Sequence, residues 1–119
     1  MPPRVTLFSG DARNAIVAAT SSTLGQTAKS AFGMAAYTAS KAAVAALTAA
    51  LAEEVAKNGI LVNAVAPSIM DTAANRAAMP KADFAVWPKV EEVAATIAFL
   101  ASPENKVTRG GIVPVYGRS

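Results

Sequence analysis

The chain contains no histidine and no cysteine in 119 residues. A Ser-His-Asp or Cys-His relay therefore cannot be assembled, and the usual ligands of a zinc site are missing, so no metal site is expected. Without cysteine there are no disulfides, and no cationic and apolar leader segment is found, so we expect a soluble, cytoplasmic protein. No apolar run approaches the length of a membrane span, and we expect no membrane partner. Tyrosine, lysine and carboxylates remain as proton-transfer groups.

Charge is also sparse, at 16% of residues, and the 11 basic and 8 acidic side chains are scattered. No Lys/Arg cluster with interleaved aromatics is present, so we expect no nucleic-acid partner. The apolar fraction of 53% is high enough for a packed core. A chain of this length is the size of one small domain, which we expect to comprise residues 1–119.

Three wholly apolar runs predict buried strands, and two long runs of helix-forming residues separate them. This alternation predicts an α/β fold in which helices cover a parallel sheet. The expected strands are 14–20, 60–66 and 111–116, with a further short strand at 4–8; the expected helices are 35–57 and 88–102, and residues 68–88 should be irregular with one or two helical turns.

Tyr37 and Lys41 lie four residues apart in the first long helix, so both side chains should be on one face. A nearby ammonium favours the phenolate and lowers a tyrosine pKa from its reference near 10, which would make Tyr37 a proton donor and acceptor. Ser22, on the loop after the first strand, could then hold a substrate oxygen. The alternative is an amphipathic edge tyrosine beside an ordinary solvated lysine, and spacing alone favours it because the pattern is weak.

Three segments in order, IVAATSSTLG, AAYTASKAAV and NGILVNAVAPSIMDT, resemble the C-terminal part of the short-chain dehydrogenase/reductase family, from about Ala12 to Gly117. The resemblance implies a Rossmann-like fold and an NAD(P)-dependent enzyme that reduces a carbonyl or imine. It implies that Tyr37 protonates the acceptor and that Lys41 lowers the tyrosine pKa and holds the ribose hydroxyls of NAD or NADP. It further implies that Ser22 orients the substrate.

The same resemblance assigns the segment after the second strand to the nicotinamide end of the cofactor. The positions that match are Pro67, Ile69 and Thr72. Residues 71–87 are similar to the corresponding stretch of dihydropteridine reductases, which suggests a reduced pterin as one substrate. Phe84 and Trp87 could stack on such a ring. The alternative is that these two aromatics close the core beneath a loop.

The sequence departs from the family in several places, among them a slightly longer interval from Ser22 to Tyr37. It has no G-x-x-x-G-x-G turn, so the N-terminal nucleotide-binding half of the family's domain is expected to be missing. Ser68 replaces the glycine that commonly follows the proline, and YGRS replaces the usual glycine pair after the last strand. A catalytically silent truncated fragment is therefore the alternative function. A hydrolase with Lys41 activating Ser22 is a weaker alternative, because no S-x-x-K spacing exists.

A parallel sheet cut in its middle would expose an apolar strand edge and apolar helix faces. In the family, the tyrosine-bearing helix packs on its symmetry mate. The resemblance therefore implies a homo-oligomer that forms through the Ala35 to Lys57 helix, whose many alanines permit close approach.

Overall fold

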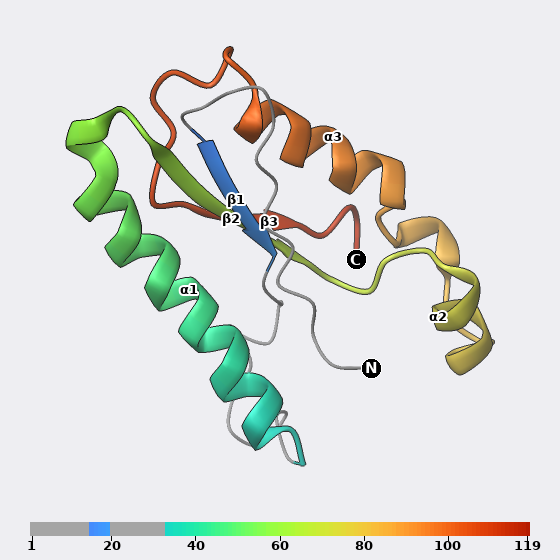
Figure 1. Ribbon diagram of the computed structural model, residues 1–119. Coiled ribbons are helices and arrows are strands. Elements are labelled where there is room, and N and C mark those ends of the chain that lie inside the picture. Colours follow the sequence, from blue (N-terminus) through green and yellow to red (C-terminus); the bar gives the residue numbers. More distant parts are fainter. Residues whose placement is uncertain (1–14, 20–32) are drawn as a thin grey trace.

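The computed structural model describes residues 15–19 and 33–119. They form a parallel sheet with strand order β1-β2-β3, covered by α1 on one face and α3 on the other (Figure 1). The predicted α/β fold is therefore confirmed, while the predicted strand at 4–8 and the loop that carries Ser22 lie outside the described residues. The elements are β1 (Ala15–Ala19), α1 (Ala35–Val55), the 3-10 turn η2 (Ala56–Asn58), β2 (Leu61–Pro67), α2 (Ala73–Ala78), the 3-10 turn η3 (Phe84–Val86), α3 (Val90–Ala101) and β3 (Ile112–Val115).

The core on the α3 face is built from alternate residues of the three strands. Val17 of β1 and Val65 of β2 pack against Leu100 of α3, and all three are almost fully buried. Val113 and Val115 of β3 extend the same cluster. Strands β1 and β2 read as continuous apolar runs because α1 packs on their other face.

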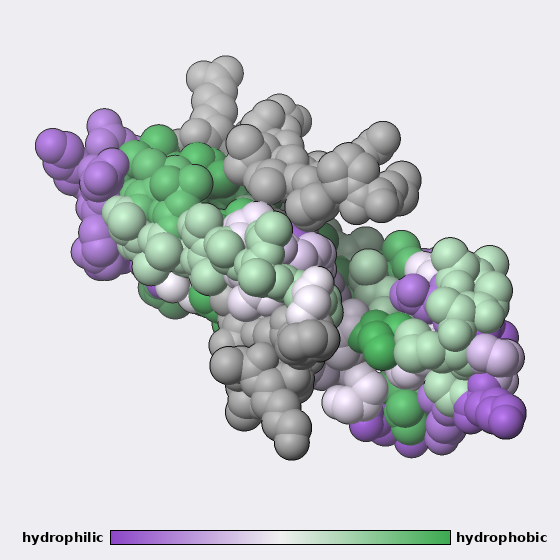
Figure 2. Space-filling model, turned by 90° about the horizontal axis from the view of Figure 1, so that it is seen from below, coloured by the Kyte–Doolittle hydropathy of each residue, from purple (hydrophilic) through white to green (hydrophobic). Residues whose placement is uncertain are grey.

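Helix α1 packs on β2 through Thr48 and Ala52, which are 3% and 0% exposed. The helix ends at Val55, and the turn η2 that continues it is capped by Gly59, which adopts a left-handed conformation with φ of +71°. Seen from below, small and weakly apolar side chains cover much of the outer surface of α1 (Figure 2). Its exposed positions include Ala39, Ala43 and Leu47.

Residues Ala35–Asn58 are long and apolar enough to cross a membrane, judged by length and composition alone. The expectation that no apolar run approaches the length of a membrane span is therefore wrong, because this helix reaches that length. The alanines that raise the mean hydropathy are the same residues that make this a strong helix former. In this structure the helix lies along the sheet and contacts β2.

Helix α3 begins at Val90, two residues later than predicted. Lys89 is its N-cap residue, and the Glu92 carboxylate accepts a hydrogen bond from the Lys89 N–H at 2.8 Å. Pro88 lies outside the helix because its carbonyl accepts from the Asp71 N–H at 2.9 Å. A contact distant in sequence therefore fixes the start of this helix.

Residues 71–89 leave the sheet and return to it. Asp71 and Lys89 form an isolated parallel bridge that closes this excursion, and α2 and η3 lie within it (Figure 1). We call residues 71–89 the excursion lobe. The expectation of an irregular segment with one or two helical turns is confirmed here.

Asn63 is a polar residue in the middle of β2, yet it is 0% exposed. Its amide donates to the Thr108 carbonyl at 2.8 Å and accepts from the Gly111 N–H at 3.1 Å. Asn105 donates to the carbonyls of Leu100 and Thr108, each at 3.1 Å. These two asparagines fix the connection between α3 and β3 through its backbone.

Candidate functional site

The first turns of α1 lie at the carboxyl edge of the sheet. Because β1 and β2 are parallel, the helix between them runs back, and its N-terminus lies near the carboxyl ends of the strands. Tyr37 and Lys41 are on these first turns. The carboxyl edge is where open α/β sheets bind their ligands.

Tyr37 and Lys41 differ sharply in exposure. The Tyr37 side chain is 38% exposed, whereas Lys41 is only 6% exposed. The Lys41 Nζ lies 5.7 Å from the centroid of the Tyr37 ring. An ammonium at this distance from a ring face is attracted to it. The alternative of an ordinary solvated lysine is therefore wrong for Lys41, and the pair forms one unit with the tyrosine toward solvent.

The other predicted site residues are placed as follows. Ser22 lies outside the described residues. Pro67 is the last residue of β2 and pairs with Val115, so the loop after it begins at the carboxyl edge. Ile69 is 41% exposed on this loop. The Thr72 hydroxyl accepts from the Asn75 N–H at 3.2 Å as the N-cap of α2.

Phe84 and Trp87 pack on each other, with ring centroids 5.0 Å apart and planes tilted by 52°. Trp87 is only 7% exposed. The Arg76 guanidinium lies over the Phe84 ring, 4.8 Å from its centroid. The rings cover each other inside the excursion lobe, as expected for aromatics that close a core.

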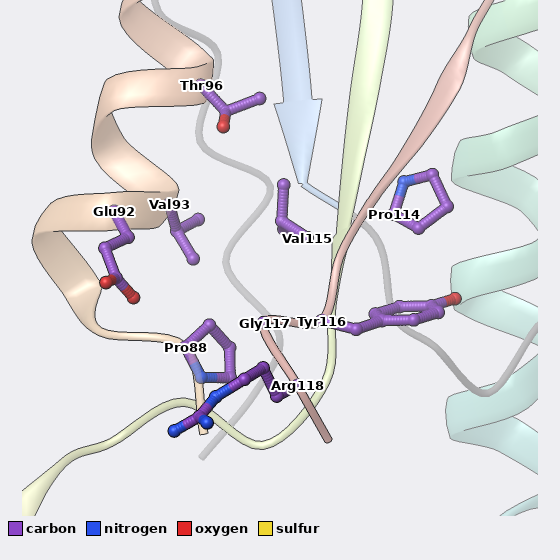
Figure 3. Close-up of a pocket in the computed structure, with 9 residues that line it drawn as sticks. All are labelled: Pro88, Glu92, Val93, Thr96, Pro114, Val115, Tyr116, Gly117 and Arg118. Atoms are coloured by element: carbon purple, nitrogen blue, oxygen red, sulfur yellow. The ribbon is translucent and has the colours of Figure 1, made fainter. Parts of the chain in front are cut away.

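A cavity of about 650 Å³ lies between the N-terminal part of α3 and residues 114–118 (Figure 3). Val93 and Thr96 line its helical side, and Val115 points toward them from β3. Its volume is within the range of small-molecule sites. Sequence reasoning did not find it, because its walls come from segments that are apart in the sequence.

In residues 15–19 and 33–119, no three acidic, cysteine or histidine side chains gather closely enough to hold a metal ion.

The Asp71–Arg76 pair gives the excursion lobe a predicted pH dependence. Two hydrogen bonds from Arg76, at 2.6 and 2.8 Å, hold the pKa of Asp71 below its ordinary value of 3.8, although partial desolvation opposes them. A lowered pKa means that the pair stabilises the lobe above pH 4 and that this contribution is lost as the pH falls further. The only tryptophan, Trp87, reports on this lobe.

We expect Trp87 fluorescence of the native chain to stay constant from pH 7 to about 4. Asp71→Asn should shift the emission to longer wavelength already at pH 7, because the ion pair is lost. Glu91→Gln, on the exposed first turn of α3, is the matched control and should behave like the native chain. Identical emission of Asp71→Asn and the native chain at neutral pH would contradict the expectation.

A parallel sheet with a Tyr-Lys unit at its carboxyl edge has the architecture of the nucleotide-binding α/β proteins. Residues 8–117 match the family model described as enoyl-(acyl carrier protein) reductase. The 3-oxoacyl-(acyl-carrier-protein) reductase of Vibrio cholerae is 37% identical over 93 residues, which cover 71% of this chain and 38% of the relative.

Two solved structures share the fold. Acetoin dehydrogenase from Enterobacter cloacae has a TM-score of 0.73 at 32% identity, over 91% of this chain and 43% of that one. A protein from Beutenbergia cavernae, described as an NAD(P)-dependent gluconate 5-dehydrogenase with NADP at low occupancy, has a TM-score of 0.73 at 32% identity, over 90% of this chain and 46% of that one.

The chain therefore belongs to the short-chain dehydrogenase/reductase family. It spans 38% of the length of the Vibrio relative and less than half of each of the two solved chains.

Proposed function

We propose that the chain acts as an NAD(P)-dependent oxidoreductase that reduces a carbonyl or imine, with Tyr37 as the general acid. The observation that carries this proposal is the burial of Lys41 against Tyr37 at the carboxyl edge, with 5.7 Å between Nζ and the ring centroid. Burial holds the Lys41 side chain beside the Tyr37 ring and out of bulk solvent. Here the ammonium would stabilise the phenolate that forms when Tyr37 gives up its proton.

The proposed residues divide the chemistry between them. The Tyr37 hydroxyl donates its proton to the acceptor oxygen or nitrogen during reduction, and takes it back in the reverse direction. Ser22 donates a hydrogen bond that orients the acceptor. Lys41 also donates to the ribose hydroxyls, while Pro67, Ile69 and Thr72 form the wall at the nicotinamide end. The cofactor supplies the hydride when it is bound.

The residues present fit one end of the cofactor. The Tyr37–Lys41 unit and the loop after Pro67 are at the same edge of the sheet. The 119 residues contain no G-x-x-x-G-x-G turn to receive the pyrophosphate. The second candidate is a catalytically silent chain that keeps folding and association.

The acceptor is proposed only by class. The named relatives act on a 3-oxoacyl group, acetoin and gluconate, which supports a carbonyl or its alcohol. A dihydropteridine stays a candidate through the resemblance of residues 71–87, and it belongs in the same substrate screen. The burial of Trp87 does not favour stacking of a pterin on that ring.

We also propose that α1 carries a contact between two copies. Its outer surface is lined by small exposed residues such as Ala39, Ala43 and Ala46, and Leu47 is 63% exposed among them. Small side chains allow two helices to approach closely. A two-fold pairing of this kind would place two Tyr37–Lys41 units in one assembly.

The decisive experiment is a calorimetric titration of the purified chain with NADH and NADPH, with its mass in solution measured alongside. We expect saturable binding, weakened at least about tenfold by Lys41→Met, because the ammonium that holds the ribose is lost while its apolar stem is kept. Lys57→Met is the control, since this lysine is exposed in η2 at the far end of the helix. No binding up to millimolar cofactor would favour the catalytically silent chain.

A further inference from the structure

Residues Tyr116–Ser119, which we call the return segment, fold back over the loop that follows β2. The Ser68 Oγ lies 2.7 Å from the Ser119 Oγ and 3.2 Å from the Tyr116 carbonyl oxygen. The Ser119 hydroxyl donates to the same carbonyl at 2.7 Å. Because the Ser119 proton is used on this carbonyl, the single proton of the Ser68 hydroxyl can go either to the Ser119 Oγ or to the carbonyl, and both contacts link Ser68 to the return segment.

The return segment also contacts the far end of the excursion lobe. The Arg118 N–H donates to the Val86 carbonyl, and its Nη2 donates to the Ala85 carbonyl, both at 3.0 Å. The segment thus joins the exit from β2 to the turn η3, which lie apart in the sequence. Both acceptors are backbone carbonyls, so the contact between the return segment and the excursion lobe does not depend on the side chains of the lobe.

Gly117 allows the close approach. Its φ is +62°, and a Cβ at this position would lie 3.1 Å from both the Pro88 nitrogen and the Val86 carbonyl oxygen. Both neighbours are backbone atoms that cannot turn away. Any other residue would therefore strain the backbone at this position and shift the return segment against the lobe by a few tenths of an ångström.

The loop from Pro67 to Asp71 is anchored in the backbone at its two ends. Pro67 pairs with Val115 in the sheet, and the Asp71 N–H donates to the Pro88 carbonyl. Between these ends, Ser68 supplies a side-chain anchor to the return segment. Ile69, which is 41% exposed, follows directly.

We propose that Ser68 and the return segment position the loop 67–72 for the nicotinamide end of the cofactor. This role rests on the proposed oxidoreductase function. Ser68 and the residues after β3 are two of the places where the sequence departs from its family, and here the structure joins these two departures by hydrogen bonds. A glycine at position 68 has no hydroxyl for this contact. Ser68 is therefore a positioning residue and does not touch the reacting atoms.

The test combines amide hydrogen exchange of residues 67–72 with titration of NADH and NADPH. Ser68→Ala should raise exchange in this segment and weaken cofactor binding by about three- to tenfold, the effect of one lost hydrogen bond. Ser68→Thr should restore both, because it keeps the hydroxyl. Gly117→Ala should reproduce the effect of Ser68→Ala from the other side of the contact.

Ser102→Ala is the matched control. It removes an exposed hydroxyl that donates to the Phe99 carbonyl at 2.7 Å, at the end of α3. A similar loss of thermal stability is expected, with cofactor affinity unchanged. The positioning role would be overturned if Ser68→Ala left the amide exchange of residues 67–72 unchanged. It would also be overturned if the native chain bound cofactor and Ser68→Ala bound it with the same affinity. If the native chain binds neither cofactor, the proposed oxidoreductase function is rejected, and the positioning of the loop for a cofactor is rejected with it. Amide exchange then tests only whether the Ser68 contact orders residues 67–72.

Discussion

Tyr37→Phe is expected to reduce turnover by about 10²- to 10⁴-fold for any carbonyl or imine that the chain reduces, the usual contribution of a positioned proton donor. The substitution removes the phenol oxygen and keeps the ring, whose centroid lies 5.7 Å from the Lys41 Nζ. The fold should therefore be unchanged. Steady-state rates with NADH or NADPH, together with circular dichroism of the variant, test both parts.

Tyr116→Phe is the control for the loss of a phenol. Tyr116 is 37% exposed, almost the same as Tyr37, and follows β3 at the same edge of the sheet. Its variant should keep its turnover. Ser22→Ala should cost less than Tyr37→Phe, because it removes an orienting hydrogen bond and leaves the proton source. Turnover retained in Tyr37→Phe would end the proposed mechanism.

Asn63→Ala is expected to lower the free energy of unfolding by about 2–4 kcal/mol, since a buried amide with two partners is lost. The Gly111 N–H would be left without its acceptor from Asn63, and the Thr108 carbonyl would keep only its bond from Asn105. Urea unfolding followed by Trp87 fluorescence and by circular dichroism measures the change.

The comparison for Asn63 is Asn58→Ala, at an exposed position in η2. A surface change of this kind should stay within about 0.5 kcal/mol. Asn63→Asp should also be destabilising, because a carboxylate would face the Thr108 carbonyl in place of a donor. A loss below about 1 kcal/mol in Asn63→Ala would show that the connection is held by other contacts.

Most of the fold could be predicted because its elements depend on local patterns. Apolar runs marked β1, β2 and β3, and the helix formers from Ala35 marked α1. Local patterns predict the start of α3 two residues too early, because the Pro88 carbonyl accepts a hydrogen bond from Asp71, a residue distant in the sequence. The role of Asn63 within its apolar strand cannot be predicted, since no local pattern shows that its hydrogen-bond partners come from residues 108–111.

The candidate site could be predicted only in part. Helical spacing is sufficient to place Tyr37 and Lys41 on one face. It could not say that the lysine is buried and the tyrosine partly exposed, because that difference depends on how α1 packs on the sheet. The contacts of Ser68 and the cavity beside α3 join segments about twenty to fifty residues apart, beyond the reach of any local pattern.

The two asparagines that hold the α3–β3 connection do so through backbone atoms of Leu100, Thr108 and Gly111. The exposed side chains of the same connection are therefore free to vary without loss of its shape. Val107 is one of them, at 84% exposed. In a chain without cysteine, Val107→Cys would provide a unique thiol at which a spectroscopic label or a surface tether can be attached while the sheet and the Tyr37–Lys41 unit stay native.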